Sequence, residues 1–245
     1  MKIKLTLLFL FTFNSHALAT DLDYSKAAGH TGIYVNLKNV RSLKCRIKTY
    51  DLTAKNNKLG WYTAWPMIVD YKTGKFVQIG YITSPMQKIL KPTFYVAWSD
   101  DGKQINIKYL PDNKSSGNAL TPTLWHEYAL SLNTDGSANI QIDGIKYLED
   151  LADRVNTGIS SGTGEFFAEG SNLDVDISTE FSHCAFKLVG DTEWKDIDQN
   201  KDILLYYISK GTSIERKEEN NFFIKGKVKA VGKGDFFAKI PKISQ

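Results

Sequence analysis

Apolar and polar residues alternate with a period of two along most of this chain, which is the pattern of β-strands with one buried face. Residues 43–48 show it plainly, because apolar residues at the odd positions alternate with three charged residues. Asp-Gly and Thr-Gly pairs, which favour tight turns, separate several of the alternating segments. Many short strands at regular spacing predict an all-β sandwich or barrel. The expected strands are residues 32–37, 43–52, 61–69, 76–82, 93–99, 105–109, 125–133, 138–142, 165–170, 181–189, 203–209, 222–231 and 236–240.

The stretch from Trp125 to Gly144 is predicted to form two successive hairpins. It opens with Trp125-His126 and ends in an Asp143-Gly144 turn, and in this it resembles the central meander of concanavalin-A-like jelly-roll domains. The resemblance implies an antiparallel two-sheet sandwich, a fold that hosts lectins, glycosidases, polysaccharide lyases and peptidases alike. Helical spacing of four apolar residues in segment 147–155 predicts one short helix.

Residues 1–19 have the pattern of a cleavable secretory signal. Lys2 and Lys4 form a basic start, an apolar stretch follows, and Ala17 and Ala19 are small residues at the two positions that a signal peptidase reads. The apolar stretch is too short to span a bilayer, and no later segment reaches the ~20 apolar residues that a membrane helix needs. We therefore expect an exported protein, secreted or periplasmic, without a transmembrane segment.

Residues 20–245 are expected to form one domain, which is long enough to bury a substantial core. The formal net charge of +4 at pH 7 includes two lysines of the signal segment, so we expect no nucleic-acid partner, and we expect a monomer. Positive charge gathers near the C-terminus, where Lys225, Lys227 and Lys229 share one face of an expected strand. Such a basic C-terminal strand region indicates a charged edge that resists aggregation, or else a surface for an acidic polysaccharide or a membrane.

The chain contains two cysteines, Cys45 and Cys184. The local alternation places both side chains on the inward face of their strands. An even number of cysteines in an exported protein predicts a disulfide bond between them. Two free, buried thiols are the alternative.

Four segments carry the most specific functional signal. They are Ala-Trp-Pro-Met-Ile-Val-Asp at 64–70, Phe-Val-Gln-Ile-Gly-Tyr at 76–81, Phe-Tyr-Val-Ala-Trp-Ser-Asp at 94–100 and Gly-Glu-Phe-Phe-Ala-Glu at 164–169. In this order they resemble the motifs of the fungal and bacterial glutamic peptidases, and more distantly those of the plant neprosin type. The resemblance covers residues 61–169 and implies a hydrolase whose cleft lies on the concave sheet of a jelly roll.

By this resemblance, Gln78 and Glu165 take the places of the catalytic Gln and Glu. A carboxylate beside a water molecule removes its proton, and a side-chain amide donates a hydrogen bond to the oxyanion of the tetrahedral intermediate. Because the Glu acts first as a base and then as an acid, the resemblance implies activity at low pH. The residues expected to bind substrate are Trp61, Trp65, Trp98, Tyr95 and Glu169.

Three alternatives stay open. The first is a relative of the peptidases that binds without catalysis. The second is a carbohydrate-binding module, which Trp61, Trp65 and Trp98 favour because flat aromatic rings stack on sugars. A small adhesin or structural protein without a cleft is the third; Gln78 and Glu165 are then ordinary strand residues and the tryptophans belong to the core. The expected ligand is a polypeptide or a polysaccharide in a cleft. Convergence of Gln78 and Glu165 in one cleft, within reach of one water molecule, would favour the peptidase, and a groove lined only by aromatic and amide side chains would favour binding.

The sequence predicts neither a cofactor nor a metal site. Segment 196–202 spaces acidic side chains as a calcium loop does, but Lys201 stands where Gly is expected and Tyr207 where Glu is expected. We therefore interpret the segment as a solvated turn. The histidines show no metal-ligand spacing, and no Gly-rich phosphate loop is present.

Overall fold

The structure is a computed structural model, and it describes residues 29–50, 61–84, 89–110, 124–150, 154–170, 176–218, 221–227 and 234–237. The expected signal segment, residues 1–19, lies outside the described residues. In the part that is described, no helix combines the length and the apolar character needed to cross a membrane.

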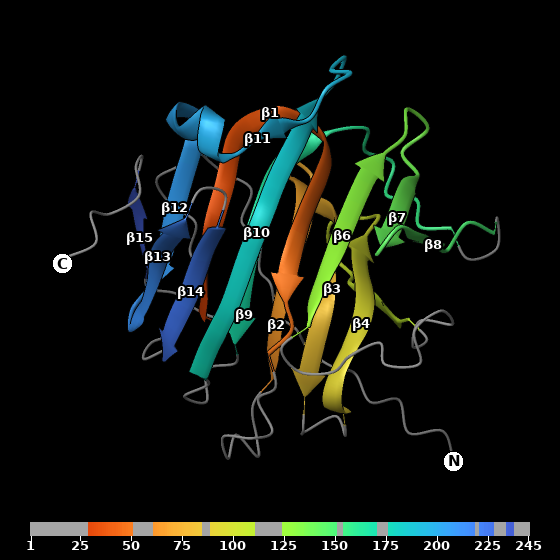
Figure 1. Cartoon of the computed structure of the whole chain (residues 1–245). Coiled ribbons are helices and arrows are strands. Elements are labelled where there is room, and N and C mark those ends of the chain that lie inside the picture. The colour runs from red at the N-terminus through yellow and green to blue at the C-terminus, as the bar shows by residue number, and fades with distance from the viewer. Residues whose placement is uncertain are drawn as a thin grey trace, which may run out of the picture.

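The described chain is built almost entirely of β-strands, as the alternation predicts (Figure 1). The strands are β1 (Gly29–Lys48), β2 (Tyr62–Asp70), β3 (Lys75–Ser84), β4 (Ile89–Ser99), β5 (Asn106–Tyr109), β6 (Trp125–Leu132), β7 (Ala138–Ile142), β8 (Ile145–Tyr147), β9 (Gly162–Gly170), β10 (Asp176–Leu188), β11 (Lys195–Asp196), β12 (Leu204–Ser209), β13 (Thr212–Glu218), β14 (Asn221–Lys227) and β15 (Gly234–Phe237). A 3-10 helix, η3 (Asp198–Ile203), precedes β12. Every strand pair is antiparallel.

Strand β1 belongs to both layers of the sandwich. Its first half, Gly29 to Val35, pairs with β9 and β12, whereas its second half, from Ser42 onward, pairs with β10 and β6; Val40, between them, pairs with both β9 and β10. Between Val35 and Val40 the side chains become exposed and the strand arches over one end of the molecule (Figure 1). The alternation predicts two separate strands here, 32–37 and 43–52, and the structure joins them into one bent strand.

The first sheet has the order β15-β12-β1-β9-β2-β3-β4-β5, and the second has the order β13-β14-β10-β1-β6-β7-β8. The short β11 pairs with β10 at the margin of the second sheet. Strand β14, which carries Lys225 and Lys227, lies between β13 and β10. Over its described residues the expectation of a charged edge strand is therefore wrong: pairing on both sides makes β14 an interior strand, and Lys225 forms a 2.6 Å ion pair with Glu215. Lys229 lies outside the described residues.

The main core fills the space between the two sheets. The first half of β1 contributes Ile33 and Val35 and the second half contributes Leu43 and Ile47, all with at most 1% of their surface exposed. Alternation within each strand sends these side chains inward and their neighbours outward. The predicted meander places His126 and Tyr128 in this core, as the alternation requires.

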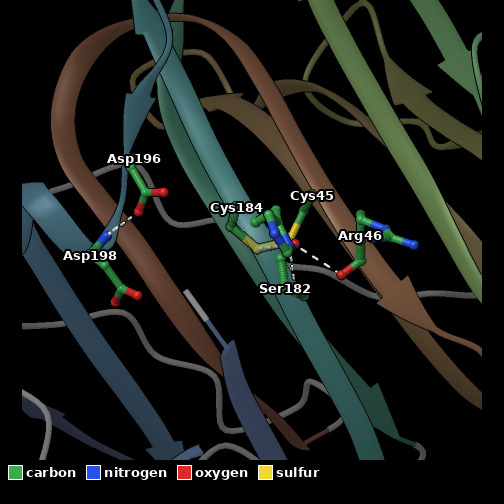
Figure 2. Close-up of a disulfide and its surroundings, with 7 residues drawn as sticks. Cys45, Arg46, Ser182, Cys184, Asp196 and Asp198 are labelled. Carbon is green, nitrogen blue, oxygen red and sulfur yellow. Dashed lines mark hydrogen bonds between the residues drawn. A yellow bond between two sulfur atoms is a disulfide. The ribbon is translucent and has the colours of Figure 1, made fainter. Parts of the chain in front are cut away.

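Cys45 and Cys184 form a disulfide bond, which confirms the predicted pairing (Figure 2). Both side chains are fully buried, and their Cα atoms lie 4.1 Å apart on the neighbouring strands β1 and β10. The bond therefore connects two strands of the second sheet, across 139 residues of sequence.

The predicted helix at 147–155 is not helical where the structure describes it. Tyr147 ends β8, and Leu148 adopts a left-handed backbone with φ of 58°, which stops a right-handed helix at that point. Val155 is buried and its carbonyl accepts a hydrogen bond from the Ala138 amide. Leu151 and Ala152, two of the four apolar residues on which the predicted helix depends, lie outside the described residues.

Candidate functional site

The first sheet is apolar on both faces. An antiparallel sheet of a sandwich usually packs one face against the core and presents polar side chains to solvent on the other face. Here that face carries a second buried apolar cluster, which makes it unlike ordinary solvent-facing sheet surface. Its buried members are Tyr34, Trp65, Met67, Val69, Phe76, Ile82, Tyr95, Ala97, Phe167 and Tyr207.

A pocket of about 810 Å³, including the space open to solvent, lies on this face of the first sheet, the one that points away from the core. Three polar groups stand out within an otherwise mostly apolar lining, namely the carboxyl groups of Glu165 and Glu169 and the amide of Gln78. No Lys or Arg is among the described residues that line it. The lining residues are His30, Trp61, Thr63, Trp65, Met67, Tyr71, Phe76, Gln78, Ile82, Tyr95, Ala97, Ile105, Ile107, Glu165 and Glu169.

The strand register brings Gln78 and Glu165 to this pocket from positions far apart in the sequence. Glu165 of β9 pairs with Met67 of β2, and Met67 pairs with Gln78 of β3. Residues opposite each other in a ladder point to the same face, so all three side chains point into the pocket. At about 4.8 Å per strand, the backbones of Glu165 and Gln78 are roughly 10 Å apart. The side chain of Met67 lies between them on the same face of the sheet.

Glu165 is a buried carboxyl with one firm hydrogen-bond donor. Only 2% of its surface is exposed, and the Tyr71 hydroxyl donates a hydrogen bond to Glu165 Oε1. The pKa of Glu165 is raised to about 8, because burial, which raises it most, and the nearby Glu169 together outweigh the lowering effect of the Tyr71 hydrogen bond. The carboxyl is therefore largely protonated at pH 7 and becomes a base only as the pH approaches 8.

Glu169 lies four residues further along β9, on the same face. Burial raises its pKa to about 8 as well, and the nearby indole of Trp65 lowers it by a smaller amount. The indole N–H of Trp65 is close enough to lower the pKa of Glu169, but the two groups do not form a hydrogen bond of good geometry. Trp65 Nε1 and Glu169 Oε1 both lack a hydrogen-bond partner among the described residues. Opposite Glu169 in the ladder stands His30 of β1, which also lines the pocket.

The Gln78 amide is tied to a buried chain of hydroxyl groups. Gln78 Nε2 donates a hydrogen bond to the Tyr95 hydroxyl, which lies 2.7 Å from Thr63 Oγ1. Thr63 Oγ1 in turn donates to the backbone carbonyl of Tyr81 at 2.8 Å. Burial raises the pKa of Tyr95 far above its ordinary value, so its hydroxyl keeps its proton across the physiological range.

Trp65, which lines the pocket, stacks on the buried ring of Phe167. The rings of Trp65 and Phe167 are nearly parallel, with centroids 5.3 Å apart and an angle of 15° between their planes. Gly80 of β3 lies beside Trp65, and a Cβ atom there would come within 2.2 Å of the Ala64 carbonyl oxygen. Glycine therefore fits this position, because the backbone of Ala64 leaves no room for a side chain.

Most of the residues predicted to form the site line the pocket, namely Gln78, Glu165, Trp61, Trp65, Tyr95 and Glu169. Trp98 does not, because it packs against the core between the sheets, on the opposite face of β4. The sequence interpretation missed Thr63 and Tyr71. Thr63 has the same parity as Trp61 and Trp65, so alternation could have found it. Tyr71 lies just past the end of β2, where alternation no longer applies.

No family model matches this chain, and no curated protein matches it. Solved structures do match. Two crystal structures of scytalido-glutamic peptidase, each with a transition-state analogue, align with TM-scores of 0.54 and 0.55, and each covers 81% of this chain and 98% of theirs. A third, SCP-B of the eqolisin family in complex with the tripeptide Ala-Ile-His, aligns over the same shares with a TM-score of 0.50.

The fold is that of the glutamic peptidases. This establishes the predicted concanavalin-A-like, two-sheet jelly roll over most of the chain. Identity to each of the three structures is only 11%, so the likeness concerns the fold.

Proposed function

We propose that this chain is an exported peptidase of the glutamic type, with Glu165 as its general base and Gln78 as its oxyanion donor. The observation that carries the proposal is that a carboxyl and an amide line one pocket, two strands apart, on a fold shared with glutamic peptidases. Two of the matching structures, both of scytalido-glutamic peptidase, hold transition-state analogues, and the third, of SCP-B, holds a tripeptide. Export rests on the pattern of residues 1–19 and agrees with a buried disulfide.

In the proposed reaction, ionised Glu165 takes a proton from a water molecule as the water oxygen attacks the peptide carbonyl carbon. The carbonyl oxygen becomes an oxyanion, which accepts a hydrogen bond from Gln78 Nε2. Glu165 then transfers its proton to the nitrogen as the carbon–nitrogen bond breaks, which releases an amine and a carboxylic acid. Tyr71 keeps one oxygen of Glu165 engaged, and this leaves the other carboxyl oxygen for the water.

The lining of the pocket indicates the kind of peptide that it accepts. Apolar side chains surround the polar groups, among them Met67, Phe76 and Ile105. Without a described Lys or Arg in the lining, an acidic substrate side chain would find no counter-charge there. We therefore expect cleavage beside apolar residues of a polypeptide.

Carbohydrate binding has weaker support from the geometry. Trp65 has only 4% of its surface exposed and one of its faces covers Phe167, so little of its ring is available to a sugar. Trp98 lies on the other face of the sheet. Of the three tryptophans on which this alternative depends, Trp61 alone keeps a partly exposed place at the pocket.

The decisive experiment is proteolysis of an unfolded protein substrate between pH 3 and pH 9. Wild type, Glu165→Gln and a matched control, Glu193→Gln, are compared, since Glu193 is exposed and lies outside the pocket. We expect cleavage by wild type and control, and a loss of at least about 100-fold in Glu165→Gln. Equal cleavage by Glu165→Gln would remove Glu165 as the base. Failure of the wild type across this whole pH range would refute the peptidase.

A further inference from the structure

The hydrogen-bond chain behind Gln78 has a direction that follows from counting protons. The Tyr81 carbonyl has no proton to give, so the single hydroxyl proton of Thr63 must point at it. Thr63 Oγ1 can then only accept from Tyr95, which uses the single proton of the Tyr95 hydroxyl. Tyr95 in turn has only lone pairs left for Gln78, so the amide must present its nitrogen and not its oxygen.

We propose that Thr63 and Tyr95 are positioning residues that set the orientation of the Gln78 amide, so that an N–H rather than a C=O faces the reacting carbonyl. This inference rests on the proposed peptidase function. With Nε2 turned toward Tyr95, one N–H is held by the phenol and the second stays available on the same nitrogen. The opposite orientation would place Gln78 Oε1 beside the developing oxyanion and repel it.

The burial of the chain makes this orientation strict. Thr63 and Tyr95 each have 3% of their surface exposed, and Tyr81 is fully buried. A buried hydroxyl that loses its partner carries the full penalty of desolvation, so each group must keep its bond. An inverted amide would set two acceptors, Gln78 Oε1 and the Tyr95 oxygen, against each other with no proton between them. The backbone carbonyl of Tyr81 thus fixes the orientation of the Gln78 amide through three successive hydrogen bonds.

Substitution of Thr63 separates this role from mere support. In Thr63→Val the Tyr95 proton loses its acceptor and turns to Gln78, which inverts the amide even though the substituted side chain keeps the same shape. We expect kcat to fall by about 10- to 100-fold with KM within about twofold, because the donor acts on the transition state. Thr63→Ser keeps the hydroxyl and should restore kcat. Tyr147→Phe, which removes the buried hydroxyl group of a half-buried tyrosine of β8 in the second sheet, serves as the control and should match wild type.

A double-mutant cycle tests whether the two residues act through one chain. Tyr95→Phe alone frees the amide and should lower kcat by about tenfold, while adding it to Thr63→Val should cost little more. Additive losses, an unchanged kcat in Thr63→Val, or a Thr63→Ser as slow as Thr63→Val would each overturn the inference. Thermal melting of each variant shows that the folded protein is being measured.

A spectroscopic readout judges the inference without reference to activity. In protein with ¹⁵N-labelled glutamine, the Gln78 side-chain N–H protons should show nuclear Overhauser contacts to the Tyr95 ring in the wild type and in Thr63→Ser. They should lose these contacts in Thr63→Val. Retention of the contacts in Thr63→Val refutes the positioning role, whether or not any peptide is cleaved. Absence of cleavage by a wild type that shows the contacts refutes only the peptidase.

Discussion

Glu165 and Glu169 are two carboxyl groups that share a pocket without a described cationic side chain in its lining. Burial raises the pKa of each carboxyl group to about 8. Because the negative charge of one disfavours ionisation of the other, the two groups titrate together, in two steps that cannot be assigned to one residue each. At pH 5, a base with a pKa of 8 is ionised in only about one molecule in a thousand. The resemblance to glutamic peptidases implies activity at low pH, whereas this burial predicts activity that rises toward pH 8.

The first prediction concerns Tyr71→Phe. The Tyr71 hydrogen bond lowers the pKa of Glu165, so its removal should raise that pKa and make the ionised base scarcer at any given pH. We expect the rising limb of kcat/KM against pH to move to higher pH, with a loss of about tenfold near pH 6 that narrows above pH 9. A profile recorded between pH 4 and pH 10 measures it. A parallel drop at all pH values would show that Tyr71 acts on something other than the ionisation of Glu165.

At the scale of the strands, alternation was a sufficient guide to much of the site. Gln78 shares its face with Phe76 and Ile82, and Glu165 shares its face with Glu169, as period-two patterning predicts. The same parity reasoning, applied to β4, separates Tyr95 from Trp98, which a simple inventory of aromatic residues does not. Alternation says nothing of which strands are neighbours, and the register that joins β9 to β2 and β2 to β3 appears only in the fold.

Two features of the strands escape sequence reasoning for physical reasons. The bend of β1 depends on its switching partners from β9 to β10, a long-range event that leaves only a few exposed residues as a local trace. The segment after β8 has the spacing of a helix, yet at its described residues Leu148 has a left-handed backbone and Val155 is buried in the core, so tertiary packing overrides the weak local preference there.

The second prediction concerns Gly80→Ala in β3. A Cβ atom at this position would lie 2.2 Å from the Ala64 carbonyl oxygen and 2.9 Å from Trp65 Cβ, so backbone would have to move. We expect the free energy of unfolding to fall by about 2 kcal/mol or more. Urea unfolding measures it, with Thr93→Ala on the neighbouring β4 as a control that should cost less than about 1 kcal/mol. A Gly80→Ala protein as stable as the control would show that the contact is easily relieved.

The third prediction concerns the disulfide of the second sheet. It closes a loop of 139 residues, for which the chain-entropy relation gives a stabilisation of about 5 kcal/mol, and measured values run somewhat lower. We expect the double variant Cys45→Ala/Cys184→Ala to lose about 3–5 kcal/mol in urea unfolding. Wild type unfolded under a strong reductant should behave like the variant. A loss below about 1 kcal/mol would mean that the neighbouring strands already hold β1 against β10 without the bond.

At the scale of the whole molecule, the sandwich carries two apolar faces on one sheet, and only one of them is covered by the other sheet. The face between the sheets forms the main core, and the opposite face holds the pocket with its two buried acids. Burying those acids costs free energy whenever they are ionised. The fold therefore gives up stability at neutral pH to keep titratable groups in an apolar site, as is common for functional sites.

The fourth prediction follows from the sign of this cost. A glutamate whose pKa is 4.5 in the unfolded chain and about 8 in the folded one stabilises the fold fully below pH 4.5, and that contribution is lost as the pH rises to 8. Glu165→Gln and Glu169→Gln abolish the titration while keeping the shape. Each should therefore leave the unfolding free energy near that of wild type at pH 4 and raise it by on the order of 2 kcal/mol at pH 7.5.

Urea unfolding at both pH values measures the effect as a difference between variant and wild type, so that other titrating groups cancel. Glu193→Gln, at an exposed position, should follow the wild type at both. If the glutamine variants gain nothing at pH 7.5, the carboxyls are ionised at little cost. The pocket must then be wet enough to solvate them, and activity would extend to the low pH that the resemblance implies. If the unfolding free energy of the glutamine variants rises as predicted, the apolar sheet keeps the two acids protonated up to about pH 8. We then expect the pocket to be active at neutral and alkaline pH.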